Sequence, residues 1–327
     1  MNDYPLQPQP PLVSRRWLLT RSALGAAVLG SGALTLTACA EGGLTQVFST
    51  SPSPNEMLQT LAAELSAASS SATEPGMGAF FTTQANHVTQ EVLRQCGVDD
   101  EGQSPQACTE PAALSGAPRD PEAAYMAVIT TDPADMPAND ARFVTDQFPL
   151  LVGWYAAFAT TESQPNLGAV ATLEQQPYAE GFAERTAPEQ LATLVDLTHQ
   201  AIYTSGLAMA HAGGQLGIYA AVAARLRELR DAATAALHTL GHPVPEAAAG
   251  YSVPETRPQP SDSSRSAELF HEVLVPVTHQ LRHLAVSAES PVAREWVARW
   301  CGLIARGEAA MESIQGKDPL DVTVRGA

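Results

Sequence analysis

The stretch that decides the fold runs from Thr186 to Gly316, and it opens with TAPEQLATLVDLTHQAIYTSGLAM at residues 186–209. Its apolar and small side chains recur every three or four residues, which places them on one face of a helix. The opening Thr-Ala-Pro-Glu combines a capping box with a proline at a position where the missing N–H costs nothing. The pattern therefore predicts an amphipathic helix that ends before Gly213, where two glycines follow each other.

Three further helices follow in the same stretch. The second runs from about Leu216 to Leu240, the third begins near Ser264, and Ser290-Pro291 reads as the N-cap and first residue of the fourth. Five prolines between the second and third helices prevent a continuous helix there. At about 3.3 Å per residue this connection can cover a helix of roughly 37 Å. The sequence therefore predicts a four-helix bundle at 186–316 with one long crossover.

The N-terminus carries the signals of an exported lipoprotein. Ser14-Arg15-Arg16-Trp17-Leu18-Leu19 is a twin-arginine pattern, which marks bacterial export. The apolar run that follows is short for a membrane span. It ends in Leu36-Thr37-Ala38-Cys39, which resembles a lipobox, in which the cysteine becomes the lipidated first residue. We therefore expect a signal peptide at 1–38 and lipid on Cys39; the alternative is ordinary cleavage after Ala38, which leaves Cys39 a plain thiol.

The charge balance restricts the partners. The chain has 327 residues and a formal net charge of −17, and cleavage of the leader removes three arginines and one aspartate, which brings the charge to −19. Such an acidic chain is unsuited to nucleic acid, whose phosphates require Lys and Arg. It is equally unsuited to anionic lipid, so the membrane attachment has to come from the acyl group on Cys39. Residues 39–54, rich in Gly, Ser, Thr and Pro, then read as a flexible tether.

The segment between the tether and the four-helix stretch also has helical periodicity. Residues 55–163 predict a smaller helical bundle with helices from Asn55, at 80–96, at 121–130 and at 141–161, the last interrupted by Pro149. Residues 164–185 lack a clear period and read as a linker, and residues 317–327 read as a tail. The predicted fold class is all-α in two parts.

The cysteines fit an oxidising compartment. Cys96 follows a predicted helix and Cys108 lies in a Gly/Ser/Pro/Gln-rich loop, so a disulfide between them closes a short loop. Such a loop closure stabilises by roughly 3 kcal/mol on the chain-entropy estimate. Cys301 is left over beside Trp300, and we interpret it as a buried free thiol.

Two pairs have the spacing of metal ligands in helical bundles. Asp196 and His199 lie on the first helix, and Glu268 and His271 lie on the third, each pair at i and i+3. However, at 100° per residue both acidic residues fall roughly 150° from the centre of the apolar stripe. We therefore predict no cofactor, with iron or another transition metal bound by these four residues as the alternative.

Several residues carry a resemblance to a known family. These are His199, Ala201 and Tyr203, the Arg227-x-x-Arg230-Asp231 run, and the crossover segment Ala-Ala-Ala-Gly-Tyr-Ser-Val-Pro at 247–254. With them, residues 187–315 resemble ferritin-like domains of unknown function in exported, often lipid-anchored proteins of high-GC bacteria. Similar sequences have Glu before the first-helix His and a His within the second helix, where this chain has Thr198 and Leu226. The resemblance implies a ferritin-like bundle whose metal site has been replaced by packing groups.

These observations lead to a functional expectation. No Gly-x-Ser-x-Gly elbow, P-loop or Gly-x-Gly-x-x-Gly sequence is present. We therefore expect a non-enzymatic protein on the outer face of the cytoplasmic membrane, where it binds or scaffolds an unidentified envelope partner. The alternative is a metal-binding or redox protein of the ferritin-like class.

Overall fold

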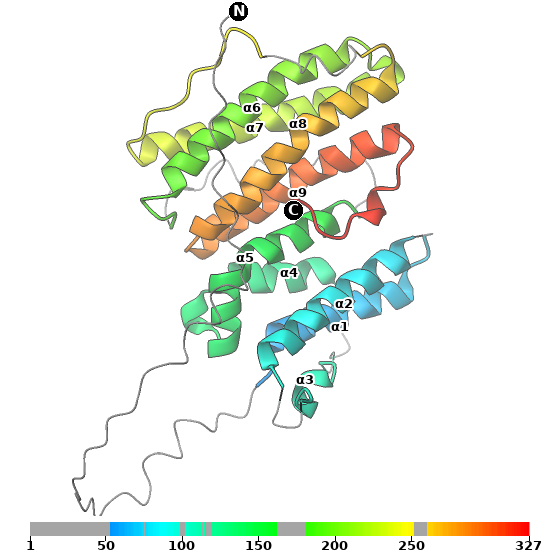
Figure 1. Ribbon diagram of the computed structural model, residues 1–327, viewed down its shortest axis with the longest axis vertical. Helices are drawn as coiled ribbons and strands as arrows, with labels where there is room; N and C mark the ends of the chain where they lie inside the picture. The colour runs from blue at the N-terminus through cyan, green and yellow to red at the C-terminus, as the bar shows by residue number, and fades with distance from the viewer. Residues whose placement is uncertain are drawn as a thin grey trace, which may run out of the picture. The chain divides into compact units, whose positions relative to one another are not determined.

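The computed structural model describes residues 53–74, 76–98, 102–112, 114, 120–161, 181–251 and 260–326. The chain divides into two units, residues 1–50 and 51–327, and only the second contains described residues. The predicted signal peptide, Cys39 and nearly all of the tether therefore lie outside the described residues. The described part is all-helical: nine α-helices pack together without a β-strand, apart from an isolated bridge between Phe182 and Ala288 (Figure 1).

The four helices predicted after residue 186 are all present. They are α6 (Ala187–Met209), α7 (Leu216–Thr239), α8 (Ser263–Leu284) and α9 (Pro291–Ile314). Ser290 caps α9 as expected, because its Oγ accepts a hydrogen bond from the Ala293 amide at 3.1 Å. The predicted capping box of α6 is wrong, because the Thr186 side chain makes no cap bond. Its Oγ1 instead lies 2.6 Å from the Oγ of Ser287, in the turn between α8 and α9.

The neighbours of these helices follow from the connections. The short turns make α6 antiparallel to α7 and α8 antiparallel to α9, and α6 also packs along α8. Helix α9 contacts α7 more weakly than it contacts α8. Thr198 and Leu226 are fully buried, so the prediction that these positions are packing groups is confirmed.

Five helices precede this group: α1 (Glu56–Ser71), α2 (Met77–Cys96), α3 (Gln106–Thr109), α4 (Pro121–Thr130) and α5 (Ala138–Ala159). Asn55 caps α1 through the Leu58 amide at 2.9 Å. Helices α1 and α2 form an antiparallel pair, α1 packs on α4, and both α4 and α5 pack on α9. Gly302 permits the close contact of α9 with α5, because a Cβ there would lie 3.0 Å from Ala159 Cβ.

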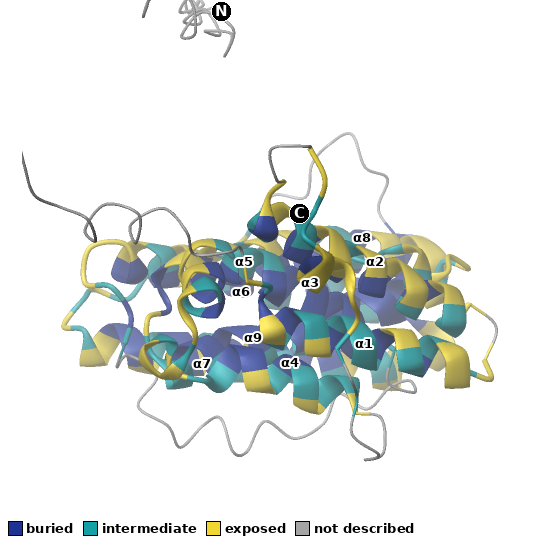
Figure 2. Cartoon of the chain, turned by 90° about the horizontal axis from the view of Figure 1, so that it is seen from below, coloured by how far each residue is buried: buried dark blue, intermediate teal, exposed yellow. Residues whose placement is uncertain are grey.

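Helix α9 is therefore enclosed by helices from both halves of the sequence. Sixteen of its 24 residues are buried (Figure 2), and the less buried ones, among them Glu295, Arg299 and Arg306, lie along one face. The sequence pattern predicted one apolar stripe, as for a helix on a surface. The difference arises because α5 and α4 cover the face that α8 leaves open. Arg294 on that face is thus an interior group, and it donates to the carbonyl oxygens of Ile129 and Thr131 at the end of α4.

One apolar core runs through the described helices, from Leu58 in α1 to Met311 in α9. The predicted division into two domains at 164–185 stays a prediction, because residues 162–180 lie outside the described part. Among the described helices, none combines the length and the apolar character that a membrane crossing requires.

Candidate functional site

The four residues of the alternative metal site differ in their burial. Asp196 and Glu268 are exposed, while His199 and His271 are half-buried. Burial, followed by the positive charge of Arg230 on α7, lowers the pKa of His199. Within the described residues, no group of three or more His, Cys, Asp or Glu side chains has an arrangement that could hold a metal ion.

His271 instead belongs to a buried ionic cluster between α8, α9 and the C-terminal tail. Its Nε2 lies 3.2 Å from Glu312 Oε1. Arg325 donates from Nη2 to Glu312 Oε2 at 2.7 Å and from Nη1 to Glu308 Oε2 at 3.1 Å and Glu312 Oε1 at 3.2 Å. The Thr278 hydroxyl donates to the other oxygen of Glu308. The five side chains form one connected network, in which Arg325 is only 2% exposed.

The pKa values of the two carboxyl groups are shifted in opposite directions. Burial raises the pKa of Glu308, although Arg325 and the Thr278 hydroxyl act in the opposite direction. Burial also opposes the ionisation of Glu312, but hydrogen bonds from His271 and Arg325 outweigh it and lower the pKa of Glu312. One guanidinium faces two carboxyls, so the second carboxyl to ionise is the costly one. Glu312 is therefore the principal counter-ion of Arg325.

The tail reaches the cluster through two positions where only glycine fits. A Cβ on Gly153 of α5 would lie 3.1 Å from the Arg325 carbonyl oxygen, and the Arg325 amide donates to the Gly153 carbonyl at 3.1 Å. Gly326 has a φ of 68°, and a Cβ there would lie 3.0 Å from the Thr278 carbonyl oxygen. Gln84 of α2 donates to the Thr323 carbonyl at 3.3 Å. The tail thus joins α2, α5, α8 and α9.

Chemically, this arrangement pairs two buried carboxyls with one guanidinium, one imidazole and one hydroxyl. Every charge in the cluster faces an opposite charge or a hydrogen-bond donor. Cys301, two turns before Glu308 on α9, is a buried free thiol as predicted, and its Sγ lies 3.8 Å from the Thr278 carbonyl oxygen. Burial raises the pKa of this thiol far above its usual range, so the nucleophilic thiolate is suppressed.

Sequence reasoning missed Glu308, Glu312 and Arg325. One signal was present: Glu308 and Glu312 are one turn apart and alternate with Ala305, Ala309 and Met311, which are all buried. Two acidic residues on the apolar side of a helix require a counter-ion. The sequence does not indicate where that counter-ion lies, because residues 317–327 read as a tail without a partner. The expectation of an uncharged interior is therefore wrong for the α8–α9 face.

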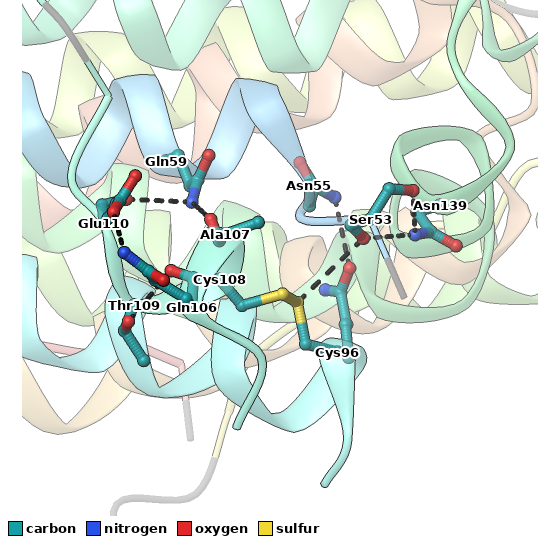
Figure 3. Close-up of a disulfide and its surroundings, with 11 residues drawn as sticks. Ser53, Asn55, Gln59, Cys96, Gln106, Ala107, Cys108, Thr109, Glu110 and Asn139 are labelled. Carbon is teal, nitrogen blue, oxygen red and sulfur yellow. Dashed lines mark hydrogen bonds between the residues drawn. A yellow bond between two sulfur atoms is a disulfide. The ribbon is translucent and has the colours of Figure 1, made fainter. Parts of the chain in front are cut away.

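The predicted disulfide is present between Cys96, at the end of α2, and Cys108 in α3 (Figure 3). Gln59 of α1 holds the same loop: its Nε2 donates to the carbonyl oxygens of Ala107 at 2.9 Å and Glu110 at 3.0 Å. A cavity of about 160 Å³ lies beside this loop, between α1 and α2. The disulfide and Gln59 together fix the short helix α3 against the α1–α2 pair.

Comparisons with known proteins give no relative. No protein-family model, no curated protein sequence and no solved structure matches this chain. The fold and the chemistry of its side chains therefore carry the functional inference.

Proposed function

We propose that the chain is an exported, lipid-anchored envelope protein that binds or scaffolds a partner on the outer face of the cytoplasmic membrane. The twin-arginine pattern and the lipobox-like end of the leader support export and lipidation at Cys39. The disulfide between Cys96 and Cys108 adds independent support, because such bonds persist in oxidising compartments. The unidentified partner is a protein of the envelope.

We further propose that α6–α9 form a ferritin-like bundle. The support is their wiring: two antiparallel helix pairs are joined by one long crossover between α7 and α8. Helix α6 packs on both α7 and α8, and α9 packs on both α8 and α7, which is the neighbour pattern of four helices around one core.

The observation that carries the non-enzymatic assignment is the buried ionic cluster. Arg325 occupies the space between Glu308 and Glu312 and donates to both carboxylates at 2.7–3.2 Å. These carboxylates are thereby engaged by a side chain of the same protein, and their position is closed to a substrate. Together with the suppressed thiolate of Cys301, this leaves the outer surface as the working part of the molecule.

Fractionation and lipid labelling test the proposal. The full-length chain should take up labelled fatty acid in a bacterial host with twin-arginine export, and it should sediment with membranes. Cys39→Ala should abolish the label and release an exported soluble form. Arg15→Lys combined with Arg16→Lys should retain the chain in the cytoplasm. Unlabelled wild type in the soluble fraction would refute the lipid anchor, and export of the double-Lys variant would refute the twin-arginine route.

A metal-binding function is the second candidate. One observation favours it: His271 lies 3.2 Å from Glu312, so an imidazole and a carboxylate do meet in the interior. Elemental analysis of the purified protein decides between the two. The scaffold proposal requires no stoichiometric iron, manganese or zinc. A ratio near one or two per chain, abolished by His199→Ala with His271→Ala, would instead establish the metal-binding function.

A further inference from the structure

A second hollow on the molecule has a composition suited to a ligand. It is an open groove of about 350 Å³ between α2, α5 and the C-terminal tail, which is near the lower end of the range for small-molecule sites. Leu150 and Trp154 of α5 and Val324 of the tail supply its apolar part, while α2 supplies its polar part through His87, Gln90, Glu91 and Arg94. We call these seven residues the α2–α5 groove.

The polar side of the groove is electrically balanced. Arg94 donates to both oxygens of Glu91, from Nε at 2.6 Å and from Nη2 at 2.5 Å, so the two charges neutralise each other. The chain as a whole carries a formal charge of −17, which repels anions. An ionic ligand would have to separate the Arg94–Glu91 pair or oppose the overall charge. A neutral ligand needs neither.

His87 and the amide of Gln90 supply the remaining hydrogen-bonding capacity of the groove. The Nδ1 of His87 is buried and has no hydrogen-bond partner among the described residues. Such an unpaired nitrogen has a free-energy cost that a partner removes. A ligand hydroxyl can either donate or accept, so it can pair with the imidazole in either tautomer, provided that the ring turns to present a nitrogen to the groove.

The tail wall of the groove is held by the buried ionic cluster. Val324 directly precedes Arg325, whose amide donates to Gly153 and whose guanidinium is bound by Glu308 and Glu312. Its neighbour Thr323 accepts a hydrogen bond from Gln84 at 3.3 Å. The groove is therefore preformed, which lowers the entropic cost of binding.

We propose that the α2–α5 groove is a binding site for a small neutral amphiphile: an apolar chain or ring lies on Leu150, Trp154 and Val324, and one hydroxyl bonds to His87. This site is independent of the lipid on Cys39 and of the proposed envelope partner. It assigns the protein a ligand class that the fold class alone does not indicate.

Isothermal titration calorimetry of the full-length chain with 1-octanol tests the proposal. We expect one site per chain and a negative heat-capacity change, the mark of apolar burial. Octanoate at pH 8 should bind several-fold more weakly, because it is an anion of the same chain length. Absence of a saturable heat with 1-octanol, or equal or tighter binding of octanoate, would overturn the proposal.

Three variants locate the site. His87→Ala should weaken 1-octanol binding about threefold to tenfold through the lost hydrogen bond. Leu150→Asp should abolish binding, because it places a carboxylate on the apolar side. His238→Ala, an exposed histidine at the end of α7, is the matched control and should leave binding unchanged. If Leu150→Asp fails to fold, His87→Ala still decides, and unchanged binding in that variant refutes the site.

One further outcome is informative. Replacement of residues 165–178 by a Gly-Ser linker should leave 1-octanol binding unchanged. If binding occurs only after this replacement, the occupant of the groove is the chain's own segment, and the small-molecule proposal is wrong.

Discussion

Replacement of Arg325 by Met tests whether the buried ionic cluster holds the described helices together. Met is similar in length but removes the guanidinium, so Glu308 and Glu312 lose the cation that lies 2.7–3.2 Å from their oxygens. Removal of one partner of a buried ion pair costs about 3–5 kcal/mol. A domain of this kind has a total stability of about 5–15 kcal/mol, so the loss is a large fraction of it.

Urea unfolding followed by far-UV circular dichroism measures this loss. At about 2–4 °C per kcal/mol, the melting temperature should also fall by about 10 °C. Arg227→Met on the exposed face of α7 is the matched control, and its effect should stay within about 0.5 kcal/mol. A loss below about 1 kcal/mol for Arg325→Met would show that the guanidinium does not hold the tail.

The same reasoning predicts a rescue. Arg325→Met combined with Glu308→Met and Glu312→Met removes all three charges and leaves side chains of similar length. Apolar replacement of a complete buried ionic group is often neutral or stabilising. The triple variant should therefore recover most of the stability that Arg325→Met loses. If the triple variant is less stable than Arg325→Met alone, then cavity formation and not the unpaired charge explains the loss.

The pH dependence follows from the opposite pKa shifts of the two carboxyls. The pKa of Glu308 is raised in the folded protein, so its stabilising contribution is present at low pH and is lost as pH rises through that folded pKa. The pKa of Glu312 is lowered, so its contribution is present above the ordinary Glu pKa and is lost as pH falls through the folded value. At pH 8, Glu308→Gln should therefore destabilise less than Glu312→Gln, and the reverse order would contradict the assignment.

Three further predictions concern packing and the thiols. Gly302→Val should destabilise the fold by about 1–3 kcal/mol, because the new side chain meets Ala159 and Tyr155. Gly206→Ala, which has open space around it, is the control and should stabilise the fold by about 0.5–1 kcal/mol. Equal effects of the two variants in thermal melts would contradict the close contact of α9 with α5. Cys96→Ser with Cys108→Ser should cost about 3 kcal/mol in urea unfolding, and an unchanged midpoint would show that the disulfide does not stabilise the fold. Cys301 should react with a thiol reagent only at the rate of unfolding, and rapid labelling of this residue under native conditions, mapped by mass spectrometry, would contradict its burial.

The helices were predictable because their ends are local signals. The Asn55 cap of α1, the Pro121 start of α4 and the Ser290-Pro291 start of α9 each lie where the sequence places them. A cap depends on a side chain and an amide two or three residues away, so a single sequence contains all of the information. Thr186 is the exception, because its hydroxyl bonds to Ser287, about a hundred residues away in the chain.

The ionic cluster was not predictable because its contacts join residues from separate parts of the chain and leave no local signal. Arg325 meets Glu308 and Glu312 because the chain turns back after α9, and Gly153 and Gly326 leave room for that turn. None of these contacts produces a period or a spacing in the sequence. The sequence could not place the four residues of the alternative metal site relative to one another, because i, i+3 spacing fixes a helix face but not which neighbouring helix covers it.

The position of α9 connects these findings to function. A helix buried over most of its surface cannot keep charged residues on its buried side unless they are paired, because an unpaired interior charge costs more than its hydrogen bonds return. Glu308 and Glu312 are therefore tolerated only together with Arg325, and their pairing removes them as ligands for a substrate. The same contacts hold Val324 beside Gly153 and so shape the α2–α5 groove. The interior charges thus act on the surface indirectly: they hold in place the tail segment that forms one wall of a binding site.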